Sequence, residues 1–311
     1  MKLSIVTTLF NSETYINDFH KRVSVVAQKL VDEDFEIIFV NDGSPDRSLE
    51  VALKLTKSHQ NVTIIDLSRN FGHHKAMMTG LNYADGELVF LIDSDLEEEP
   101  EWLIDFNNQM KKDQCDMIYG IQDNRRGEIL ERITGSLFYK IFRLLTQINQ
   151  PDNIVTARLM TRRYVKALIS HEEREINIGG LWISTGFKQT TRIVSKHSTS
   201  PTTYSFRSKF GHLVNAITSF SSLPLVFIFY SGLIISSSSV IYISYLCLRY
   251  IFFSQAPSGY TSLISSIWLF SGLIIFFIGI QGIYLSKIFS EVKRRPNTIV
   301  RTVYKEFANK A

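Results

Sequence analysis

The sequence predicts an α/β domain on a mostly parallel sheet, followed by an interfacial helix and two membrane-spanning helices. Short apolar runs alternate with segments of helical periodicity through the first hundred residues. These runs are nearly continuous in apolar character, which is typical of parallel strands buried on both faces. The last third of the 311-residue chain holds two long runs without Asp, Glu, Lys or Arg. The chain therefore divides into an α/β part and a membrane part.

The order of the apolar runs indicates where a site should lie. We expect strands within residues 2–10, 35–44, 61–68 and 86–95, and helices within residues 11–30, 46–59 and 72–84. In open parallel sheets, ligands bind beyond the carboxyl ends of the strands. The polar residues that follow each run are therefore candidates for one shared site.

Two uncharged runs, Phe210–Leu248 and Tyr250–Ser286, predict the membrane part. Each contains an apolar segment of about 20 residues or more, the length that crosses a bilayer core. We place the spans at about residues 223–248 and 262–285. The alternative is a pair of buried helices in a soluble domain, but a domain of this size rarely needs two consecutive uncharged helices.

The flanking charges predict the orientation. The segment after the second span, residues 287–311, holds seven Lys and Arg against two Asp and Glu, whereas the connection between the spans holds one Arg. Positive residues stay cytoplasmic, so we expect both termini inside the plasma (inner) membrane. The basic tail either lies against anionic headgroups or only solubilises the chain. The opening stretch MKLSIVTTLF is too short an apolar run for a secretory signal.

Polar residues of several kinds follow the first three strands. Thr8 ends the first run and Asp42 follows the second, where its carboxylate suits a base edge or ribose hydroxyl, or caps the next helix. Arg69 follows the third run, and its planar fork suits a phosphate or a surface ion pair. Lys75 lies about one helical turn past Gly72, where backbone N–H groups can also face an anion, and is otherwise a solvated helix position. Together they indicate donor binding at one rim.

The fourth strand ends in LIDSDLEEEP, which holds five carboxylates. In an extended segment Asp93 and Asp95 project to the same side, with Ser94 between them. Paired carboxylates suit Mg²⁺ or Mn²⁺, and such an ion commonly bridges protein and substrate phosphates. We expect the glutamates at 97–99 to be mainly a solvated turn before the next helix. A metal beside a diphosphate indicates a nucleotide-sugar donor.

The successive motifs VTTLFNSE, VNDGSPDRS, LSRNFGHHKAMMTGL and VFLIDSDLEEEPE resemble the blocks of family 2 glycosyltransferases. More narrowly they resemble the polyprenyl-phosphate, dolichol-phosphate mannose synthase-like group. The resemblance covers nearly the whole chain. It implies a GT-A fold, a nucleotide-diphosphate sugar donor bound by Asp42, Asp93, Ser94 and Asp95, and a metal at Asp93 and Asp95. It also implies inverting transfer to a polyprenyl phosphate, with Asp95 in the catalytic set.

A later block is similar to the family's basic loop and the helix behind it. There Arg125 matches a basic position near the phosphates and is a candidate catalytic residue, whereas Gln122 stands where Arg is common. Arg126 is assigned to the acceptor side, although a solvated loop position explains it equally well.

The stretch VTARLMT departs from the family pattern, because Thr156 replaces an Asp that is often considered the base, while Arg158 remains as a candidate catalytic residue. A phosphate acceptor is already ionised and needs no base. If a base is required, Asp152 and Glu173 are the nearby carboxylates.

The last blocks before the membrane are expected on the acceptor side. Lys196, Tyr204 and Arg207 should lie near the bilayer surface, where a lipid phosphate arrives. The segment 209–222 has apolar residues on one face and resembles an interfacial helix. We therefore divide the chain into a cytoplasmic domain at 1–208, an interfacial helix at 209–222, two spans within 223–286 and a tail at 287–311.

The predicted function is transfer of a sugar, from a UDP-sugar in preference to a GDP-sugar, to a polyprenyl phosphate such as undecaprenyl phosphate, in the synthesis or modification of cell-surface polysaccharide. The main alternative is a membrane glycosyltransferase that extends a lipid-linked saccharide at a hydroxyl group. A non-catalytic nucleotide-sugar-binding partner is disfavoured by the intact aspartates, and a transporter by spans without ionisable residues. Small residues in the spans permit a homo-oligomer, and no nucleic-acid partner is expected.

Overall fold

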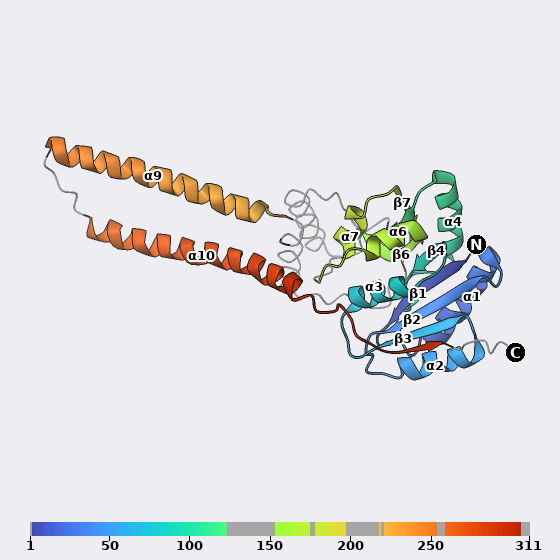
Figure 1. Cartoon of the computed structure of the whole chain (residues 1–311). Helices are drawn as coiled ribbons and strands as arrows, with labels where there is room; N and C mark the ends of the chain where they lie inside the picture. Colours follow the sequence, from blue (N-terminus) through green and yellow to red (C-terminus); the bar gives the residue numbers. More distant parts are fainter. Residues whose placement is uncertain are drawn as a thin grey trace. The chain divides into compact units, whose positions relative to one another are not determined.

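The computed structural model describes residues 2–122, 153–174, 178–196, 218, 221–253 and 259–305. The chain divides into two compact units (Figure 1). The first unit comprises residues 1–143, 148–205 and 295–311, and the second comprises residues 144–147 and 206–294. The first unit therefore takes up the chain again after the long apolar helices of the second.

The first unit is built on an eight-stranded sheet with the strand order β7-β5-β6-β4-β1-β2-β3-β8. Its centre is parallel, because β1 pairs in parallel with both β2 and β4, and β2 pairs in parallel with β3. Every residue of these four strands is buried, as their apolar sequences predict. The strands are β1 (Leu3–Leu9), β2 (Phe35–Asn41), β3 (Val62–Leu67), β4 (Leu88–Leu91), β5 (Met117–Gln122), β6 (Ile154–Thr161), β7 (Gln189–Val194) and β8 (Val300–Lys305).

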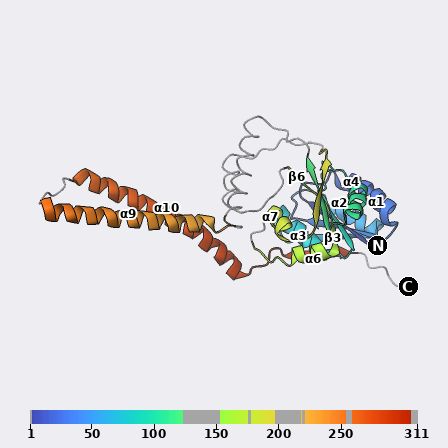
Figure 2. The same ribbon diagram turned by 90° about the horizontal axis from the view of Figure 1, so that it is seen from above.

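Helices cover both faces of the sheet, as the two views in Figures 1 and 2 show. One apolar core joins the sheet to α1 (Ile16–Val31), α2 (Ser48–Ser58) and α4 (Trp102–Asp113). The other core joins it to α3 (His73–Tyr83), α6 (Arg162–Ile169) and α7 (Ile178–Ser184). The predicted α/β class with a mostly parallel sheet is confirmed, and all the strands and helices expected in the first hundred residues are present.

Strand β8 was not expected, since the basic C-terminal segment was interpreted only as a tail. It pairs antiparallel with β3 and forms one edge of the sheet. Arg301 holds it there, with Nη1 3.2 Å from Oδ2 of the buried Asp66 and Nη2 donating to the carbonyl of Ser68. The hydroxyls of Thr298 and Thr79 lie 2.8 Å apart. Part of the tail is therefore a structural element of the α/β domain.

The second unit contains two long apolar helices, α9 (Leu223–Phe253) and α10 (Tyr260–Lys293). Segments Leu223–Tyr242 and Ser266–Lys293 are long and apolar enough to cross a membrane, and neither is buried in the described part of the chain. This matches the expected pair of spans in number and place. Of the expected interfacial helix at 209–222, only residues 218, 221 and 222 are described.

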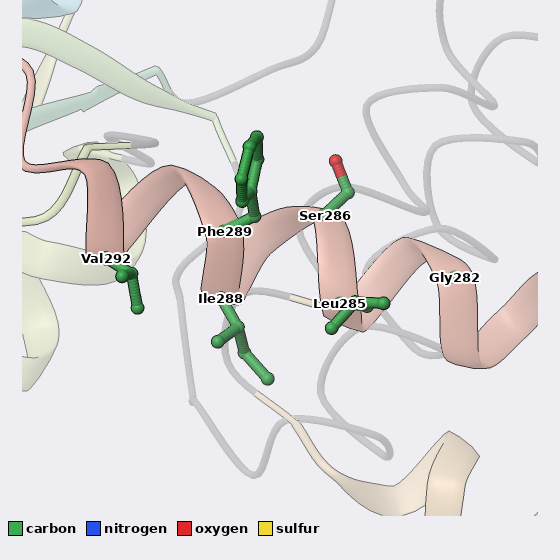
Figure 3. Close-up of a pocket in the computed structure, with 6 residues that line it drawn as sticks. All are labelled: Gly282, Leu285, Ser286, Ile288, Phe289 and Val292. Atoms are coloured by element: carbon green, nitrogen blue, oxygen red, sulfur yellow. The ribbon is translucent and has the colours of Figure 1, made fainter.

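An apolar groove runs along the last turns of α10 (Figure 3). Its large side chains are well exposed, for example Leu285 at 66% and Val292 at 72%. Such a surface is unfavourable in water and indicates contact with lipid or protein. The groove is lined by Gly282, Leu285, Ser286, Ile288, Phe289 and Val292.

Candidate active site

The carboxyl ends of β1, β2 and β4 and the start of α3 bring five polar side chains together at one rim of the sheet. Thr8 lies on β1, Asp42 follows β2, Asp93 and Asp95 follow β4, and His73 is the first residue of α3. Parallel strands end at the same edge, so residues far apart in sequence become neighbours. The rim predicted from the sequence is thus present, and His73 is an addition to it.

Asp42 is buried, and both of its carboxylate oxygens accept backbone hydrogen bonds. Oδ1 accepts from the N–H of Phe71 at 2.7 Å, and Oδ2 accepts from the N–H of Gly72 at 3.0 Å. Burial raises the pKa of Asp42 despite these two bonds, which act in the opposite direction. In this structure Asp42 fixes the loop that leads into α3, while its predicted contact with a nucleoside stays a prediction.

The loop at residues 69–72 and the first turn of α3 carry two of the expected phosphate-binding groups. The guanidinium of Arg69 lies over the ring of Phe71, 4.1 Å from its centroid, and Nη1 donates to the carbonyl of Asn70. Lys75 lies in the first turn of α3, where its own N–H bonds to the carbonyl of Gly72. Both residues are at the rim, with Arg69 exposed and Lys75 partly exposed.

Asp93 is oriented by two side chains from other elements. His73 Nε2 lies 3.3 Å from Asp93 Oδ1, and the side chain of Thr156 is near enough to affect the pKa of Asp93. Burial alone would raise the pKa of Asp93, but the hydrogen bonds from His73 and Thr156 and the charge of His73 lower it. Asp93 is therefore held ionised.

Asp95 is held by its own turn. Its Oδ1 accepts from the N–H of Glu97 at 3.0 Å, and Leu96 between them adopts a left-handed conformation with φ of 58°. Burial raises the pKa of Asp95, and the charge of Asp93 raises it further. Two neighbouring carboxylates that repel each other fit a divalent cation, which would relieve that repulsion.

The described residues of the rim supply only part of a coordination shell for a metal ion. Among the described residues there is no group of three or more His, Cys, Asp or Glu side chains arranged to hold a metal ion. Mg²⁺ in nucleotide enzymes is commonly held by one or two carboxylates together with substrate phosphates and waters. Asp93 and Asp95 fit that second arrangement, in which the donor diphosphate would supply the remaining ligands.

Ser94 faces inward rather than toward a donor. It is only 4% exposed, and its hydroxyl donates to the carbonyl of Thr8 at 2.9 Å and lies 3.2 Å from the hydroxyl of Ser12. Ser94 was predicted to contact the donor, but in this structure its side chain links the segment after β4 to β1. The effect is to fix the backbone between the two aspartates.

The expectation that the three glutamates form a solvated turn is wrong for Glu98. Its side chain is completely buried, and its carboxylate accepts from the N–H of Thr156 at 2.8 Å and of Ala157 at 2.7 Å. Burial and the charge of Asp93 raise the pKa of Glu98 to about 8. The physical reason for its burial is that Glu98 serves as the acceptor for two N–H groups of β6, which a solvated side chain could not do.

Lys196, expected at a lipid phosphate, lies beside this acidic cluster. Its Nζ is 3.1 Å from Glu97 Oε2 and 3.8 Å from Glu98 Oε1, and the side chain is 23% exposed. Burial would lower the pKa of Lys196, but Glu98, Glu97 and Asp93 raise it. The ammonium group is therefore a counter-charge to the carboxylates of the rim.

Arg158 lies below the rim, completely buried. Its guanidinium stacks on the ring of Trp182, and it donates from Nε to the carbonyl of Thr156 and from Nη2 to that of Val155, both at 2.8 Å. Burial lowers the pKa of Arg158 to about 9. Its placement suits a residue that holds Thr156 in position, and a direct catalytic contact would require a movement of the packed side chain.

Several predicted residues lie outside the described part of the chain. These are Arg125, Arg126, Asp152, Tyr204 and Arg207. The other alternative base, Glu173, lies among the described residues, after α6. Its backbone carbonyl accepts a hydrogen bond from the side chain of Asn297.

The family follows from sequence comparison. Residues 4–169 match the family model described as Glycosyl transferase family 2, so the chain belongs to that family of glycosyltransferases. This confirms the resemblance drawn from the motifs and the expectation that the protein is a glycosyltransferase.

Particular relatives match almost end to end. A Mycobacterium tuberculosis (strain CDC 1551 / Oshkosh) relative, named among glycosyltransferases, is 48% identical over 98% of this chain and 89% of its own. The prophage bactoprenol glucosyl transferase homolog of Escherichia coli (strain K12) is 30% identical over 98% of this chain and all of its own. The bactoprenol glucosyl transferase of Shigella phage SfII is also 30% identical, over 97% of this chain and 98% of its own.

One solved structure aligns over most of the chain. It is the mannosyltransferase PcManGT from Pyrobaculum calidifontis in complex with GDP-Man and Mn²⁺, which is 13% identical. The alignment covers 94% of this chain and 86% of that one, with a TM-score of 0.49.

Proposed function

We propose that this protein is a membrane-bound, metal-dependent, inverting glycosyltransferase. It transfers a sugar from a nucleotide-diphosphate sugar, with a UDP-sugar favoured, to a polyprenyl phosphate such as undecaprenyl phosphate. The product serves the synthesis or modification of cell-surface polysaccharide. The names of the bactoprenol glucosyl transferase relatives support both the lipid acceptor and a hexose as the sugar.

The observation that carries the choice of acceptor is the surroundings of Thr156. This residue stands where the family commonly has an Asp, and its side chain helps to lower the pKa of Asp93. Glu98, beside it, is completely buried with both oxygens engaged by backbone N–H groups. Glu97 is paired with Lys196. Asp42 has both oxygens engaged by backbone N–H groups, and His73 has both ring nitrogens in contact with Thr8 and Asp93. Among the described residues, the rim thus offers no unengaged base apart from the two aspartates assigned to the metal.

Without a base, the attacking oxygen must arrive already ionised. A phosphate monoester meets this condition, since its second pKa is about 6 and it is charged at neutral pH. A sugar hydroxyl does not, and would require a general base within hydrogen-bond reach. The surroundings of Thr156 therefore favour a lipid phosphate over the hydroxyl of a lipid-linked saccharide.

Asp93 and Asp95 would hold a Mg²⁺ or Mn²⁺ ion. When bound, such an ion stabilises negative charge on a leaving diphosphate. Both carboxylates already have partners in the chain: Asp93 contacts His73, and Asp95 accepts from the N–H of Glu97 in the turn at Leu96. Asp42 fixes the loop that presents Arg69 and Lys75 toward the donor phosphates.

The described helices support a membrane location on the cytoplasmic side. Segments before α9 and after α10 belong to the same folded unit, and β8 is hydrogen-bonded into its sheet. If α9 and α10 cross the bilayer, they must therefore cross it an even number of times in total. The Lys and Arg residues that follow α10 support a cytoplasmic position for this unit by the positive-inside rule.

The test is incubation of the purified protein with labelled nucleotide sugars and undecaprenyl phosphate, with and without EDTA. We expect label in the organic phase, released by mild acid, with loss of the product on addition of EDTA and in Asp95→Ala. Label that appears only on a preformed lipid-linked saccharide would contradict the proposal and favour the alternative.

A further inference from the structure

His73 lies at the rim without a packing role in the helix that it begins. The buried residues of α3 are Ala76, Met77, Gly80 and Leu81, and His73 is not among them. Its side chain remains 47% exposed. Its position is therefore explained by its polar contacts rather than by the apolar core.

The imidazole bridges two other elements of the rim. Nδ1 lies 3.0 Å from the hydroxyl of Thr8, and Nε2 lies 3.3 Å from Oδ1 of Asp93. An ionised carboxylate only accepts hydrogen bonds, so Nε2 carries the proton that it shares with Asp93. In the neutral ring Nδ1 then accepts from the Thr8 hydroxyl. The tautomer follows from the partners of the ring.

These contacts form part of a closed series of interactions that begins and ends at Asp93 and its neighbour Ser94. The hydroxyl of Ser94 donates to the carbonyl of Thr8 at 2.9 Å, the hydroxyl of Thr8 contacts Nδ1 of His73, and Nε2 of His73 forms an ion-pair contact of 3.3 Å with Asp93. Ser94 follows Asp93 in the chain, which completes the ring. The backbone and the carboxylate of Asp93 are thereby fixed to the same strand, β1.

The start of α3 is fixed as well. The carboxylate of Asp42 accepts from the N–H groups of Phe71 and Gly72, directly before His73. A ring held at both nitrogens, on a helix whose entry is held by a buried carboxylate, loses little further freedom when a ligand arrives. Such a preformed arrangement is what orients a metal ligand.

We infer that His73 is a positioning residue that orients the carboxylate of Asp93 for the divalent cation bound with the donor diphosphate. The inference rests on the proposed metal-dependent function. His73 acts through Asp93, and Thr8 acts through His73. Thr8 thereby acquires a role in orienting the metal ligand in addition to the donor contact predicted for it.

The test measures Mn²⁺ binding to the purified full-length protein in detergent at saturating UDP, with free Mn²⁺ counted by electron paramagnetic resonance. The variants are His73→Leu, His73→Gln, Thr8→Val and the double variant Thr8→Val/His73→Leu. His171→Gln is the control, a histidine just beyond α6 that has no part in the site. Circular dichroism checks that each variant folds.

We expect His73→Leu to weaken Mn²⁺ binding by at least about tenfold, the lower end of the effect of removing such a partner. His73→Gln retains an N–H donor and should lose less. Thr8→Val should weaken binding by a smaller factor, and the double variant should bind no more weakly than His73→Leu, because both substitutions break the same chain of contacts. The Mn²⁺ concentration for half-maximal transfer should rise in parallel, while the KM for the lipid stays unchanged.

Unchanged Mn²⁺ affinity in His73→Leu, or losses that multiply in the double variant, would overturn the inference while leaving the proposed function intact. If His73→Leu does not fold, the same comparison is made with His73→Gln and its double variant with Thr8→Val. A wild-type protein that binds no Mn²⁺ in the presence of UDP would instead refute the metal-dependent function, and the inference with it.

Discussion

The close approach between the turn after β2 and the loop at residues 69–72 gives a sharp prediction at Gly43. This residue has φ of +60°, and a Cβ atom added to it would lie 2.4 Å from the backbone N of Asn70 and 2.5 Å from the carbonyl carbon of Arg69. A Gly43→Ala substitution therefore carries two costs. The left-handed conformation costs about 1–2 kcal/mol, and the overlap with backbone, which cannot rotate away, costs about 1–3 kcal/mol more.

Gly186 provides the matched control. It also has a left-handed φ, of +75°, but a Cβ atom there would meet nothing within 4 Å. Gly186→Ala should therefore lose only the conformational part, about 1–2 kcal/mol. At about 2–4 °C per kcal/mol for a domain of 150–250 residues, thermal unfolding in detergent should separate the two variants.

The prediction also reaches the site, because Asn70 precedes the two N–H groups that Asp42 holds. Gly43→Ala should raise the KM for the nucleotide sugar severalfold, whereas Gly186→Ala should leave it unchanged. Equal melting temperatures and an unaltered donor KM in Gly43→Ala would refute the claim that this turn supports the loop.

Three further predictions concern other parts of the α/β unit. Glu98→Leu removes the acceptor for two buried N–H groups, which costs about 1–3 kcal/mol for each group. We therefore expect a melting temperature many degrees lower and little transfer activity. A melting curve like that of the wild type would contradict the assigned bonds. Arg301→Ala leaves the buried Asp66 without its cation and should weaken the attachment of β8 to the sheet. We expect faster amide hydrogen exchange across residues 300–305. Unchanged exchange would contradict the role assigned to Arg301. Burial lowers the pKa of His20 to about 4 from 6.5; because the unfolded chain then binds more protons, stability is complete above pH 6.5 and falls by up to roughly 3 kcal/mol toward pH 4. His20→Phe should flatten that acid dependence in pH-dependent melting, and an unchanged slope would exclude this histidine as the cause.

The residues of the rim could be predicted from the sequence because each is identified by the strand directly before it. Asp42, Asp93 and Asp95 each follow a recognisable buried strand, and parallel strands bring their ends together whatever the details of the loops. The same reasoning placed the two apolar helices, since length and absence of charge are sufficient signals.

Glu98 could not be separated from its neighbours in the same way. Three consecutive glutamates look alike in the sequence, and the buried one is distinguished by its bonds to N–H groups of β6, 58 and 59 residues later in the chain. Likewise His73 has no spacing signal, because its partners lie 65 residues before it and 20 residues after it. Such contacts depend on the assembled sheet.

Strand β8 illustrates a third limit. The segment from Val300 to Lys305, VRTVYK, shows no regular alternation of apolar and charged residues, and its partner β3 lies more than 200 residues earlier in the chain. The basic composition of the surrounding tail favoured an interpretation based on topology alone. Long-range antiparallel pairing at a sheet edge leaves little trace in one sequence.

The most direct test of the central claim compares two acceptors that differ only in the phosphate. Undecaprenyl phosphate and undecaprenol are offered to the same purified protein with the same labelled nucleotide sugar and Mn²⁺. We predict transfer to the phosphate and none to the alcohol across pH 6–9, because the described residues of the rim include no unengaged base to ionise a hydroxyl. Comparable transfer to undecaprenol would contradict this account of Thr156 and its surroundings.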